Sequence, residues 1–534
     1  MVDVVLATAN ARYQHASLAL RCLAANLSEG TTHVLVEGTI ADRAIDLVER
    51  ILAHGPRVVG LSVSVWNVEL LSEAAALLKS AAPGVRLVVG GPEVSHEHDR
   101  QAICATADIV VVGEGEEAFA RLVDDARAER PVGAHVVHGG SPKLDALRSP
   151  YVLYTAHDLQ ERVVYVESSR GCPFTCSFCL SALDERVRRF PQDAFLDDLR
   201  ALHARGARTF KFIDRTFNVH IPSALAILDL FLEWQAHDDT RAFAHFEVVP
   251  DRLPDALKER LAQFAPGAVQ LEVGVQTLDD TVSRHIARAT DRAKLDDNLR
   301  FLVEKTGCHV HVDLIAGLPG EDLASFARGF DHLFAIGPHE IQVGILKRLR
   351  GTPITHDAAR FGLSFSPRAP YEIVRSDAIG FDDLCRVRRF ARAHDLVKNS
   401  ARFPTTAPLL FVDDQEGARS PFFAFSRFAE WLHREAGALH GIALARLAEF
   451  VFRFLVEIRG HEPRAIAARL LDDYTRTGER RAPPFLLARA DVDDATKKAF
   501  AALGTHGRHG PEHRADKRAS DRRTARQDRA VAGG

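Results

Sequence analysis

Short apolar runs alternate with helix-length segments from residue 2 to residue 345 of this 534-residue chain, and this alternation limits the folds open to it. Alternating strands and helices predict parallel β-sheets whose faces are covered by helices. In such folds ligands bind beyond the carboxyl ends of the strands, where the connecting loops gather. A chain of this length has room for two or three domains. We therefore expect an α/β protein whose functional residues lie in loops that follow strands.

The N-terminal part carries five predicted strands, at Val2–Ala7, Thr32–Glu37, Val58–Val63, Arg86–Val89 and Ile109–Val112. Predicted helices separate them, at Ser17–Ala25, Arg43–Ala53, Val68–Ala81 and Glu116–Ala128. This order favours a doubly wound, flavodoxin or Rossmann-like sheet. The second part continues the alternation with six strands, at Val163–Ser168, Thr209–Ile213, Ala244–Val248, Ala268–Val273, His309–Ile315 and Glu340–Ile345. Six strand–helix units predict a partial (β/α)6 barrel rather than the closed eightfold barrel.

Three cysteines with the spacing C-x3-C-x2-C, Cys172, Cys176 and Cys179, directly follow the first predicted barrel strand. Three thiolates in so tight a loop match three corners of an iron–sulfur cluster. An all-cysteine [4Fe–4S] site needs four ligands, and no fourth cysteine lies nearby. One iron would therefore stay open to a ligand from outside the protein. The alternative is a structural zinc loop, which normally has four closed ligands with paired spacing.

This loop, with the aromatic Phe178 before its last cysteine, resembles that of the radical S-adenosylmethionine (SAM) superfamily. The resemblance implies that the open iron chelates the amino and carboxylate groups of SAM. It further implies that the reduced cluster cleaves SAM to a 5′-deoxyadenosyl radical. Such chemistry needs an electron donor such as a flavodoxin or ferredoxin.

Further matches to this superfamily lie at the ends of later predicted strands. By resemblance, Asp214 helps to hold the methionine end of SAM, and Glu272 and Gln276 face its ribose and carboxylate. Arg284 is a candidate partner for that carboxylate, and the stretch from Asp313 through Gly317 to Glu321 resembles the motif whose backbone lies against the adenine. Each of these residues taken alone also has a purely structural explanation. Taken together, in this order along the predicted strands, these residues support a SAM site.

Three turns in the N-terminal part follow strands at the expected ligand edge, and glycine in two of them would let backbone approach a ligand closely. The residues concerned are Ser62, Ser64 and Trp66 in the first turn, Gly90, Gly91, Pro92 and Glu93 in the second, and Gly113, Glu114, Gly115 and Glu116 in the third. None matches a G-x-G-x-x-G fingerprint or a P-loop, and a plain connection also explains each turn by itself.

Placed ahead of the cysteine loop, these turns together resemble the cobalamin-binding domain that precedes many radical SAM cores. The D-x-H-x-x-G motif, whose histidine ligates cobalt in some cobalamin proteins, is absent, and His15 and His96 lack that setting. The resemblance therefore implies cobalamin without a histidine ligand on its lower face. Loss of the cofactor by this domain is the alternative.

The remaining sequence predicts a helical region over 351–503 and a disordered, mildly basic tail over 504–534. Lys398–Phe403 resembles part of an uncharacterised domain that often follows this type of core. Together with the patterns above, this predicts a cobalamin-binding-like domain at 1–135, a linker at 136–157 and a radical SAM core at 158–350.

The composition of the chain bears on its partners and on the compartment in which it acts. The net charge of −4 does not indicate nucleic-acid binding, and no apolar run approaches the length of a membrane span. Seven cysteines in a chain of this length do not form a disulfide framework, and the four outside the loop are scattered. We therefore expect a cytoplasmic protein with neither a membrane nor a nucleic acid as partner, and the resemblance described above implies a small-molecule substrate.

Two chemistries fit the implied architecture. In a methylase the radical removes a substrate hydrogen and methylcobalamin donates the methyl group. In an oxidative cyclase or rearrangement enzyme, like those related to anaerobic magnesium-protoporphyrin cyclase, no methyl group moves. A non-catalytic cobalamin or redox sensor is a hypothesis of another class. The methylthiotransferases of tRNA carry further cysteines in their N-terminal domain, whereas this chain has only Cys22 and Cys104 there.

Overall fold

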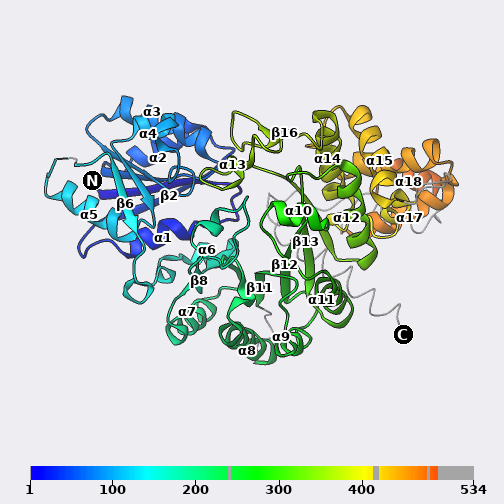
Figure 1. Ribbon diagram of the computed structural model, residues 1–534, viewed down its shortest axis with the longest axis horizontal. Coiled ribbons are helices and arrows are strands. Elements are labelled where there is room, and N and C mark those ends of the chain that lie inside the picture. Colours follow the sequence, from blue (N-terminus) through cyan, green and yellow to red (C-terminus); the bar gives the residue numbers. More distant parts are fainter. Residues whose placement is uncertain (1, 132, 238–241, 413–419, 478–481, 491–534) are drawn as a thin grey trace.

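The computed structural model describes residues 2–131, 133–237, 242–412, 420–477 and 482–490. Figure 1 shows three successive parts: a blue N-terminal α/β domain, a green partial barrel, and a helical region drawn in yellow and orange. The predicted fold class is confirmed for all three parts. The predicted tail at 504–534 lies outside the described residues. Within the described ranges, no helix is long and apolar enough to cross a membrane.

The N-terminal domain is a six-stranded parallel sheet in the order β2-β1-β3-β4-β5-β6. Its strands are β1 (Val2–Asn10), β2 (His33–Thr39), β3 (Pro56–Ser62), β4 (Arg86–Gly90), β5 (Ile109–Gly113) and β6 (Val136–Gly140). Helices α1 (Leu18–Ala25) and α5 (Glu116–Arg127) cover one face, and α2 (Ala44–Leu52), α3 (Val68–Ala81) and α4 (Ala102–Thr106) cover the other. This is the doubly wound arrangement expected from the sequence.

The sixth strand of this sheet is not visible in the sequence pattern. Residues 136–140 pair in parallel with β5, although their apolar pattern alone places them in a linker. Only Val136 and Val137 are apolar, and His138, Gly139 and Gly140 follow them. So short a run on an edge strand carries no alternation from which a strand could be predicted.

The barrel is a second six-stranded parallel sheet, in the order β14-β13-β12-β11-β10-β7. Its strands are β7 (Val164–Val166), β10 (Thr209–Phe212), β11 (Phe243–Val248), β12 (Val269–Gln276), β13 (His309–Ala316) and β14 (Glu340–Ile345). Its main outer helices are α7 (Gln192–Ala204), α8 (Ile221–His237), α9 (Asp255–Leu261), α11 (Arg292–Lys305) and α12 (Leu323–Ile336). The prediction of a partial (β/α)6 barrel is therefore confirmed.

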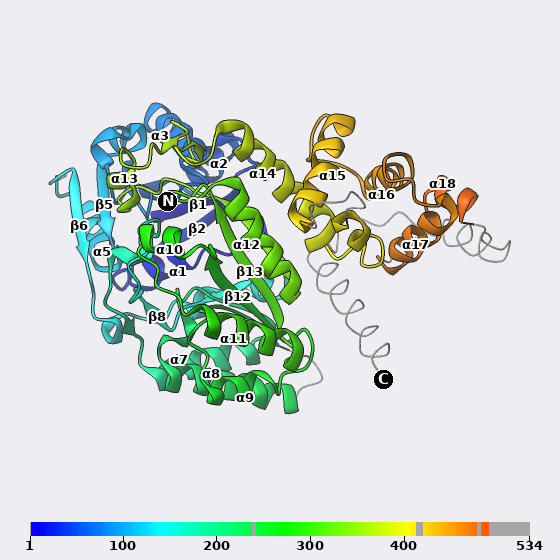
Figure 2. The same cartoon turned by 45° about the vertical axis from the view of Figure 1, so that its right-hand side comes forward.

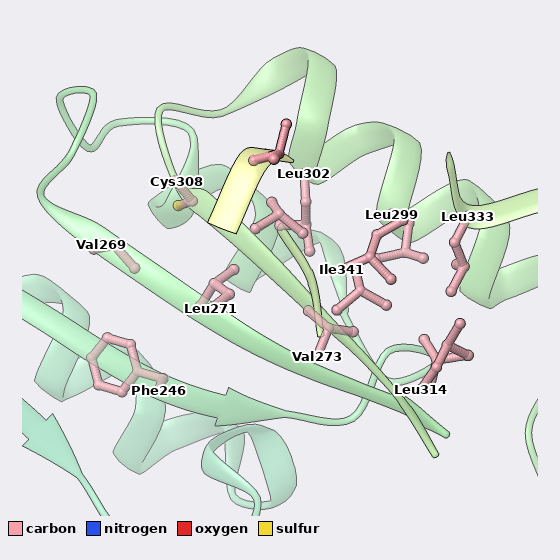
Figure 3. Close-up of a cluster of buried hydrophobic side chains, with 14 of the residues drawn as sticks. Phe246, Val269, Leu271, Val273, Leu299, Leu302, Cys308, Leu314, Leu333 and Ile341 are labelled. Atoms are coloured by element: carbon pink, nitrogen blue, oxygen red, sulfur yellow. The ribbon is translucent and has the colours of Figure 1, made fainter. Parts of the chain in front are cut away.

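Side chains alternate along the barrel strands, so that apolar residues pack under the outer helices and polar residues point into the barrel. In β12 the side chains of Leu271 and Val273 are buried under Leu299 and Leu302 of α11, as Figure 3 shows. The intervening Glu272 points to the opposite face, because successive strand side chains alternate. Burial of the apolar layer therefore turns the polar residues of each strand into the barrel.

The C-terminal region is helical and shares the hydrophobic core of the barrel. Its elements are α14 (Phe381–His394), the π-helical turn η6 (Asp395–Asn399), η7 (Ala407–Phe411), α15 (Pro421–Ala436), α16 (Leu444–Arg453), the π-helical turn η8 (Phe454–Ile458), α17 (Pro463–Arg476) and α18 (Pro484–Arg489). The Phe330 ring of α12 lies 4.9 Å from the Phe390 ring and 5.8 Å from the Phe422 ring, centroid to centroid. In Figures 1 and 2 these helices lie on the side of the barrel away from the N-terminal domain.

Neighbouring domains cover both edges of the barrel sheet. On the β7 side, the loop after β1 forms a parallel bridge between His15 and Val163, and His15 is hydrogen-bonded with Tyr165 at 2.6 Å. On the β14 side, the Asn399 amide accepts from the Ile341 N–H at 3.2 Å and donates to its carbonyl at 3.0 Å. Exposed strand edges invite pairing with other chains, so these contacts satisfy groups that an open barrel leaves free.

A buried ion-pair network joins the N-terminal domain to helix α6 (Ala156–Glu161) just before the barrel. Arg21 of α1 donates to Glu37 at 2.8 Å and to Asp158 at 2.9 Å, and Arg162 donates to the same two carboxylates at 2.9 and 3.0 Å. All four side chains are less than a tenth exposed. Despite burial, the N–H of Thr155 and the two arginines lower the pKa of Asp158 to about 2.

Replacing Asp158→Asn is expected to destabilise the protein by about 3 kcal/mol, because it removes one of the two carboxylates that neutralise the buried guanidinium groups of Arg21 and Arg162. The pKa of Asp158 lies below its ordinary value of 3.8, so its stabilising effect is present above pH 3.8 and is lost as the pH falls through about 2. Thermal unfolding at pH 7 measures the loss. Asp46→Asn is the matched control, because its pair with Arg43 is exposed and screened by solvent, so its loss should change the stability little. Equal losses in the two variants would contradict the prediction.

Candidate functional site

The cysteine loop lies at the carboxyl end of β7, between the short antiparallel strands β8 (Ser169–Arg170) and β9 (Arg188–Arg189). Cys172 and Cys176 are buried and Cys179 is half-buried. The Cys179 N–H donates to the Cys176 carbonyl at 3.0 Å, which turns the loop tightly between these two thiols. Three sulfur donors are thus carried by eight consecutive residues at the strand end, where the sequence places them.

The residues before the first cysteine explain how the loop is anchored. Gly171 has φ +90°, and a Cβ atom there would lie 2.2 Å from the Arg186 carbonyl oxygen, so only glycine fits. Asp214, fully buried after β10, accepts from the Ser168 N–H at 3.0 Å and from the hydroxyls of Ser168 and Ser169 at 2.5 and 2.6 Å. In the structure, therefore, Asp214 holds the start of the cysteine loop.

A guanidinium group that the sequence reasoning did not single out lies against the thiols. Arg288 Nη1 is 3.3 Å from Cys176 Sγ, and Nη2 donates to the Gly274 carbonyl at 2.5 Å. Burial raises the pKa of the Cys176 thiol, while Arg288 acts in the opposite direction. The predicted Arg284 is instead exposed on α10 (Asp280–His285), where it donates to Thr281 Oγ1 at 3.0 Å.

Two of the predicted SAM residues lie among charged side chains inside the barrel. His245 Nε2 lies 2.9 Å and Lys211 Nζ 3.5 Å from Glu272 Oε2, and despite burial these two neighbours lower the pKa of Glu272 to about 2. Asp313 Oδ1 lies 3.2 Å from His311 Nε2, and burial raises the pKa of Asp313. Glu272 of β12 and Asp313 of β13 therefore lie in the same part of the barrel interior, because these two strands are paired neighbours.

Two other groups in this region have unused hydrogen-bonding capacity. Gln276, after a bulge in β12, has φ +72°, and its buried Oε1 has no partner among the described residues. Glu247 of β11 also makes no side-chain hydrogen bond within the described ranges, and burial raises its pKa to about 7, against the nearby Arg215. Buried acceptors without a protein partner are expected where a ligand supplies the donor.

Gly317, the last predicted SAM residue, follows β13 with φ +87°. A Cβ atom there would lie 2.6 Å from Ile373 Cγ2, so glycine keeps this turn close to the segment that follows the barrel. Of the predicted SAM residues, Asp214, Gln276 and Gly317 lie at strand ends on the cysteine side of the barrel, whereas Glu272 and Asp313 lie in the middle of β12 and β13. Neither Glu247 nor Arg288 has a local signal in the sequence beyond its polar character, which explains why both were missed.

The predicted cobalamin turns gather at the carboxyl edge of the N-terminal sheet. The buried Asn67 side chain accepts from the Ser64 N–H at 2.8 Å and donates to the Ser62 carbonyl at 3.3 Å, which holds the turn after β3. Gly91 at φ +112° belongs to the turn after β4, and a Cβ atom there would lie 2.5 Å from the Val63 carbonyl oxygen. Trp66 is 54% exposed at this edge. Gly90, Pro92, Gly113 and Gly115 complete the turns after β4 and β5.

The acidic members of these turns form ion pairs with arginines of the barrel domain. Glu93 is buried and accepts from Arg350 Nε and from the Tyr371 hydroxyl, both at 2.8 Å. Glu114 and Glu116 each accept from Arg170 at 2.7 Å, and Glu114 also pairs with Arg188. Arg170 stands two residues before Cys172. The ligand edge of the N-terminal sheet is therefore held directly against the cysteine loop.

The donor set fits an iron–sulfur cluster with a ligand beside it. Three thiols share one loop, a guanidinium lies against one of them, and unpartnered acceptors face the same end of the barrel. In the part of the chain that the structure describes, no three His, Cys, Asp or Glu side chains converge as ligands of one metal ion. At the sheet edge, the exposed indole of Trp66 beside polar Ser64 fits a large ligand with an apolar ring system.

Comparison with known families identifies the three parts. Residues 4–123 match the family described as B12 binding domain, and residues 166–333 match the radical SAM superfamily. Residues 359–526 match a family described as a protein of unknown function, DUF4080. The resemblances predicted from the sequence are therefore confirmed for both cofactor domains and for the C-terminal region.

Two curated relatives cover the N-terminal and central parts. A 2-(S-pantetheinyl)-carbapenam-3-carboxylate methyltransferase from Streptantibioticus cattleyicolor is 27% identical over 353 residues, which is 59% of this chain and 51% of the relative. The cobalamin-dependent radical SAM methyltransferase TokK from Streptomyces tokunonensis is 27% identical over 357 residues, with the same two coverages. The chain thus spans about half the length of these relatives.

Solved structures share the fold at low identity. The cobalamin-dependent SAM radical enzyme OxsB, with aqua-cobalamin and SAM bound, has a TM-score of 0.61 and 13% identity over 95% of this chain and 84% of its own. The radical SAM methyltransferase TsrM from Kitasatospora setae, with tryptophan and a SAM analogue bound, has a TM-score of 0.59 and 15% identity, over 82% of this chain and 100% of its own.

Proposed function

We propose that this chain, which carries a B12-binding domain followed by a radical SAM domain, is a cobalamin-dependent radical SAM enzyme that methylates a small organic molecule. One observation carries the proposal. Arg170 joins the cysteine loop to Glu114 and Glu116 at the ligand edge of the N-terminal sheet, so the two cofactor sites face each other. Methyl transfer needs that closeness, because the radical and the methyl donor must reach the same substrate carbon.

The proposal assigns a role to each group of residues. Cys172, Cys176 and Cys179 would hold a [4Fe–4S] cluster, and Arg288 would bind the carboxylate of SAM beside it. Gln276, Glu247 and Asp313 would accept hydrogen bonds from the ribose and amino groups of SAM. When bound, the reduced cluster supplies the electron that cleaves SAM, and cobalamin supplies the methyl group.

The protein's own residues prepare this reaction by positioning and exclusion. Asp214 and Gly171 fix the loop, so the three thiols keep one geometry. Glu93 and Glu114 hold the N-terminal domain over the barrel mouth through Arg350 and Arg188, which shields the space between them from water. The chemistry therefore depends on the junction between the domains as well as on the loop.

The wider setting forms part of the same proposal. Residues 1–135 would bind cobalamin, with their sheet extended to Gly140 by β6, and 158–350 would form the radical SAM core after a linker. The helical region at 351–503 would close the β14 edge. We infer a cytoplasmic protein that receives electrons from a flavodoxin or ferredoxin.

The test is an anaerobic reaction of reconstituted protein with SAM, cobalamin and a strong reductant, followed by mass spectrometry. We expect 5′-deoxyadenosine, together with S-adenosylhomocysteine whose amount depends on added cobalamin. Deoxyadenosine without cobalamin-dependent S-adenosylhomocysteine, measured with a substrate that is consumed, would favour a cyclase or rearrangement enzyme. An intact cluster that yields neither product would point to a sensor.

A further inference from the structure

A cavity of about 120 Å³ lies between the N-terminal domain and the barrel, next to the cofactor sites. Its walls come from α1, from the first residue of α5 and from the connection over residues 144–151. They also include Glu167 after β7, Arg170 of β8, and Phe190 with the start of α7. None of the three loop cysteines lines it, and neither does any proposed SAM residue. Glu116 is the one predicted cobalamin residue in its wall, and no step of the proposed reaction uses the cavity.

The walls of this cavity are largely apolar. They are formed by Leu18, Leu144, Leu147, Pro150, Tyr151, Phe190, Pro191, Ala194 and Phe195, among others. A cavity of roughly 150 Å³ in another protein holds one benzene molecule. The volume here therefore suits an organic group of about five heavy atoms.

Charged side chains in the lining are predominantly acidic. Four carboxylates, from Glu116, Asp145, Glu167 and Asp198, face two guanidinium groups, from Arg148 and Arg170. Both arginines are already engaged by the protein. Arg170 donates to Glu167 at 3.0 Å and to Glu114 and Glu116 at 2.7 Å, and Arg148 donates to the Leu27 carbonyl.

The carboxylates keep acceptor capacity that the arginines do not use. Glu167 Oε1 and Asp198 Oδ2 accept no hydrogen bond from the described residues, although the opposite oxygen of each does. The Glu167 and Glu116 side chains are only 14% and 6% exposed. Buried anionic acceptors facing an apolar space suit a ligand that brings its own charged donor.

Charge balance around Arg170 supports a cation at this place. Three carboxylates, of Glu114, Glu116 and Glu167, share the two cations Arg170 and Arg188, and Arg188 also lies 3.6 Å from Asp184, so the carboxylates outnumber the guanidinium groups when all are ionised. Burial raises the pKa of Glu167 to about 7 even beside Arg170. Burial and the same carboxylates also raise the pKa of the Cys22 thiol in the wall. A monocation would relieve this excess.

We propose that this cavity binds a small organic monocation of the alkylammonium class, with the apolar body against Leu144 and Phe195 and the ammonium group between Glu116 and Glu167. A cation bound there would contact Glu167, which follows β7 and forms an ion pair with Arg170. Because Arg170 also holds Glu114 and Glu116, occupancy acts on the contact between the N-terminal domain and the cysteine loop. The cavity is thus a candidate effector site for the enzyme proposed above.

The test compares three four-carbon probes on the full, cluster-reconstituted chain: n-butylammonium, 1-butanol and butyrate. Isothermal titration calorimetry, or saturation-transfer NMR for weak binding, gives the three affinities at pH 8. We expect butylammonium to bind at least about ten-fold more tightly than 1-butanol, and butyrate not to bind. Equal or tighter binding of 1-butanol, binding of butyrate, or no binding of any probe would overturn the proposal.

Two variants locate the site. Ala194→Phe places a ring at the cavity wall and should weaken butylammonium binding at least about ten-fold. Ala201→Phe, on an exposed position of the same helix outside the lining, should leave it unchanged. Undiminished binding in Ala194→Phe contradicts this location. The outcome is separable from the proposed function, because neither variant touches a cysteine of the loop and iron content and SAM cleavage are measured on the same samples.

Discussion

Replacing Cys176→Ala is expected to abolish SAM cleavage, with a fall of at least about a thousand-fold, and to remove the visible absorbance of the cluster. The physical reason is that two thiolates and an open iron leave the cluster without a fixed position beside SAM. The measurement is the rate of 5′-deoxyadenosine formation together with iron per chain after anaerobic reconstitution. Retained cleavage in this variant would exclude the proposed enzyme.

A control separates the loss of a ligand from the loss of a buried thiol. Cys104 is buried in the N-terminal core like Cys176 in its loop, but it lies in α4, far along the chain from the cysteine motif. Cys104→Ala should reduce stability by about 1 kcal/mol and leave the iron content unchanged. Equal iron loss in both variants would mean that folding, and not ligation, is affected.

Replacing Arg288→Met is expected to lower kcat/KM for SAM by roughly 10- to 100-fold, because a charge-assisted hydrogen bond is worth about 1.5–3 kcal/mol. Arg288 Nη1 lies 3.3 Å from Cys176 Sγ, which makes it the cation placed to meet a carboxylate bound at the open iron. SAM affinity, measured by equilibrium binding to the reconstituted protein, should fall while iron per chain stays constant.

Arg284→Met is the matched control for this prediction, because both arginines follow β12 within a few residues of each other. Arg284 is exposed and donates only to Thr281 among the described residues, so its loss should change kcat/KM by less than about two-fold. The opposite result, a large loss at Arg284 and none at Arg288, would restore the assignment based on the strand-end motif. Iron loss in Arg288→Met would instead show that the residue supports the loop.

Local pattern predicts the strands and helices well where burial is periodic. The helix at Val68–Ala81 and the strand at Glu340–Ile345 have the same bounds in the structure as in the prediction. Each carries an amphipathic or alternating run long enough to specify its own geometry. The edge strand at Val136–Gly140 and the short helix at Ala102–Thr106 lack such a run, and only their packing against neighbours forms them.

The features of the candidate site likewise differ in whether a local sequence pattern encodes them. The cysteine spacing is a local property of the loop, so the sequence determines by itself that three thiols stand at a strand end. The partner of a buried charge is a contact between distant segments, and no local pattern encodes it. Glu93 and Glu114, predicted as ligand-turn residues, are thus found paired with Arg350 and Arg170 across the domain junction.

The sequence by itself therefore determined the order of the domains, the partial barrel and the place of the cysteine loop, because periodic burial and ligand spacing act over a few residues. Only the tertiary structure decided that Arg288 rather than Arg284 meets the thiols, and that Asp214 anchors the loop. It also decided how the barrel edges are closed by His15 and Asn399. These choices depend on desolvation and on pairing between residues far apart in the chain, which exist only once the domains have packed.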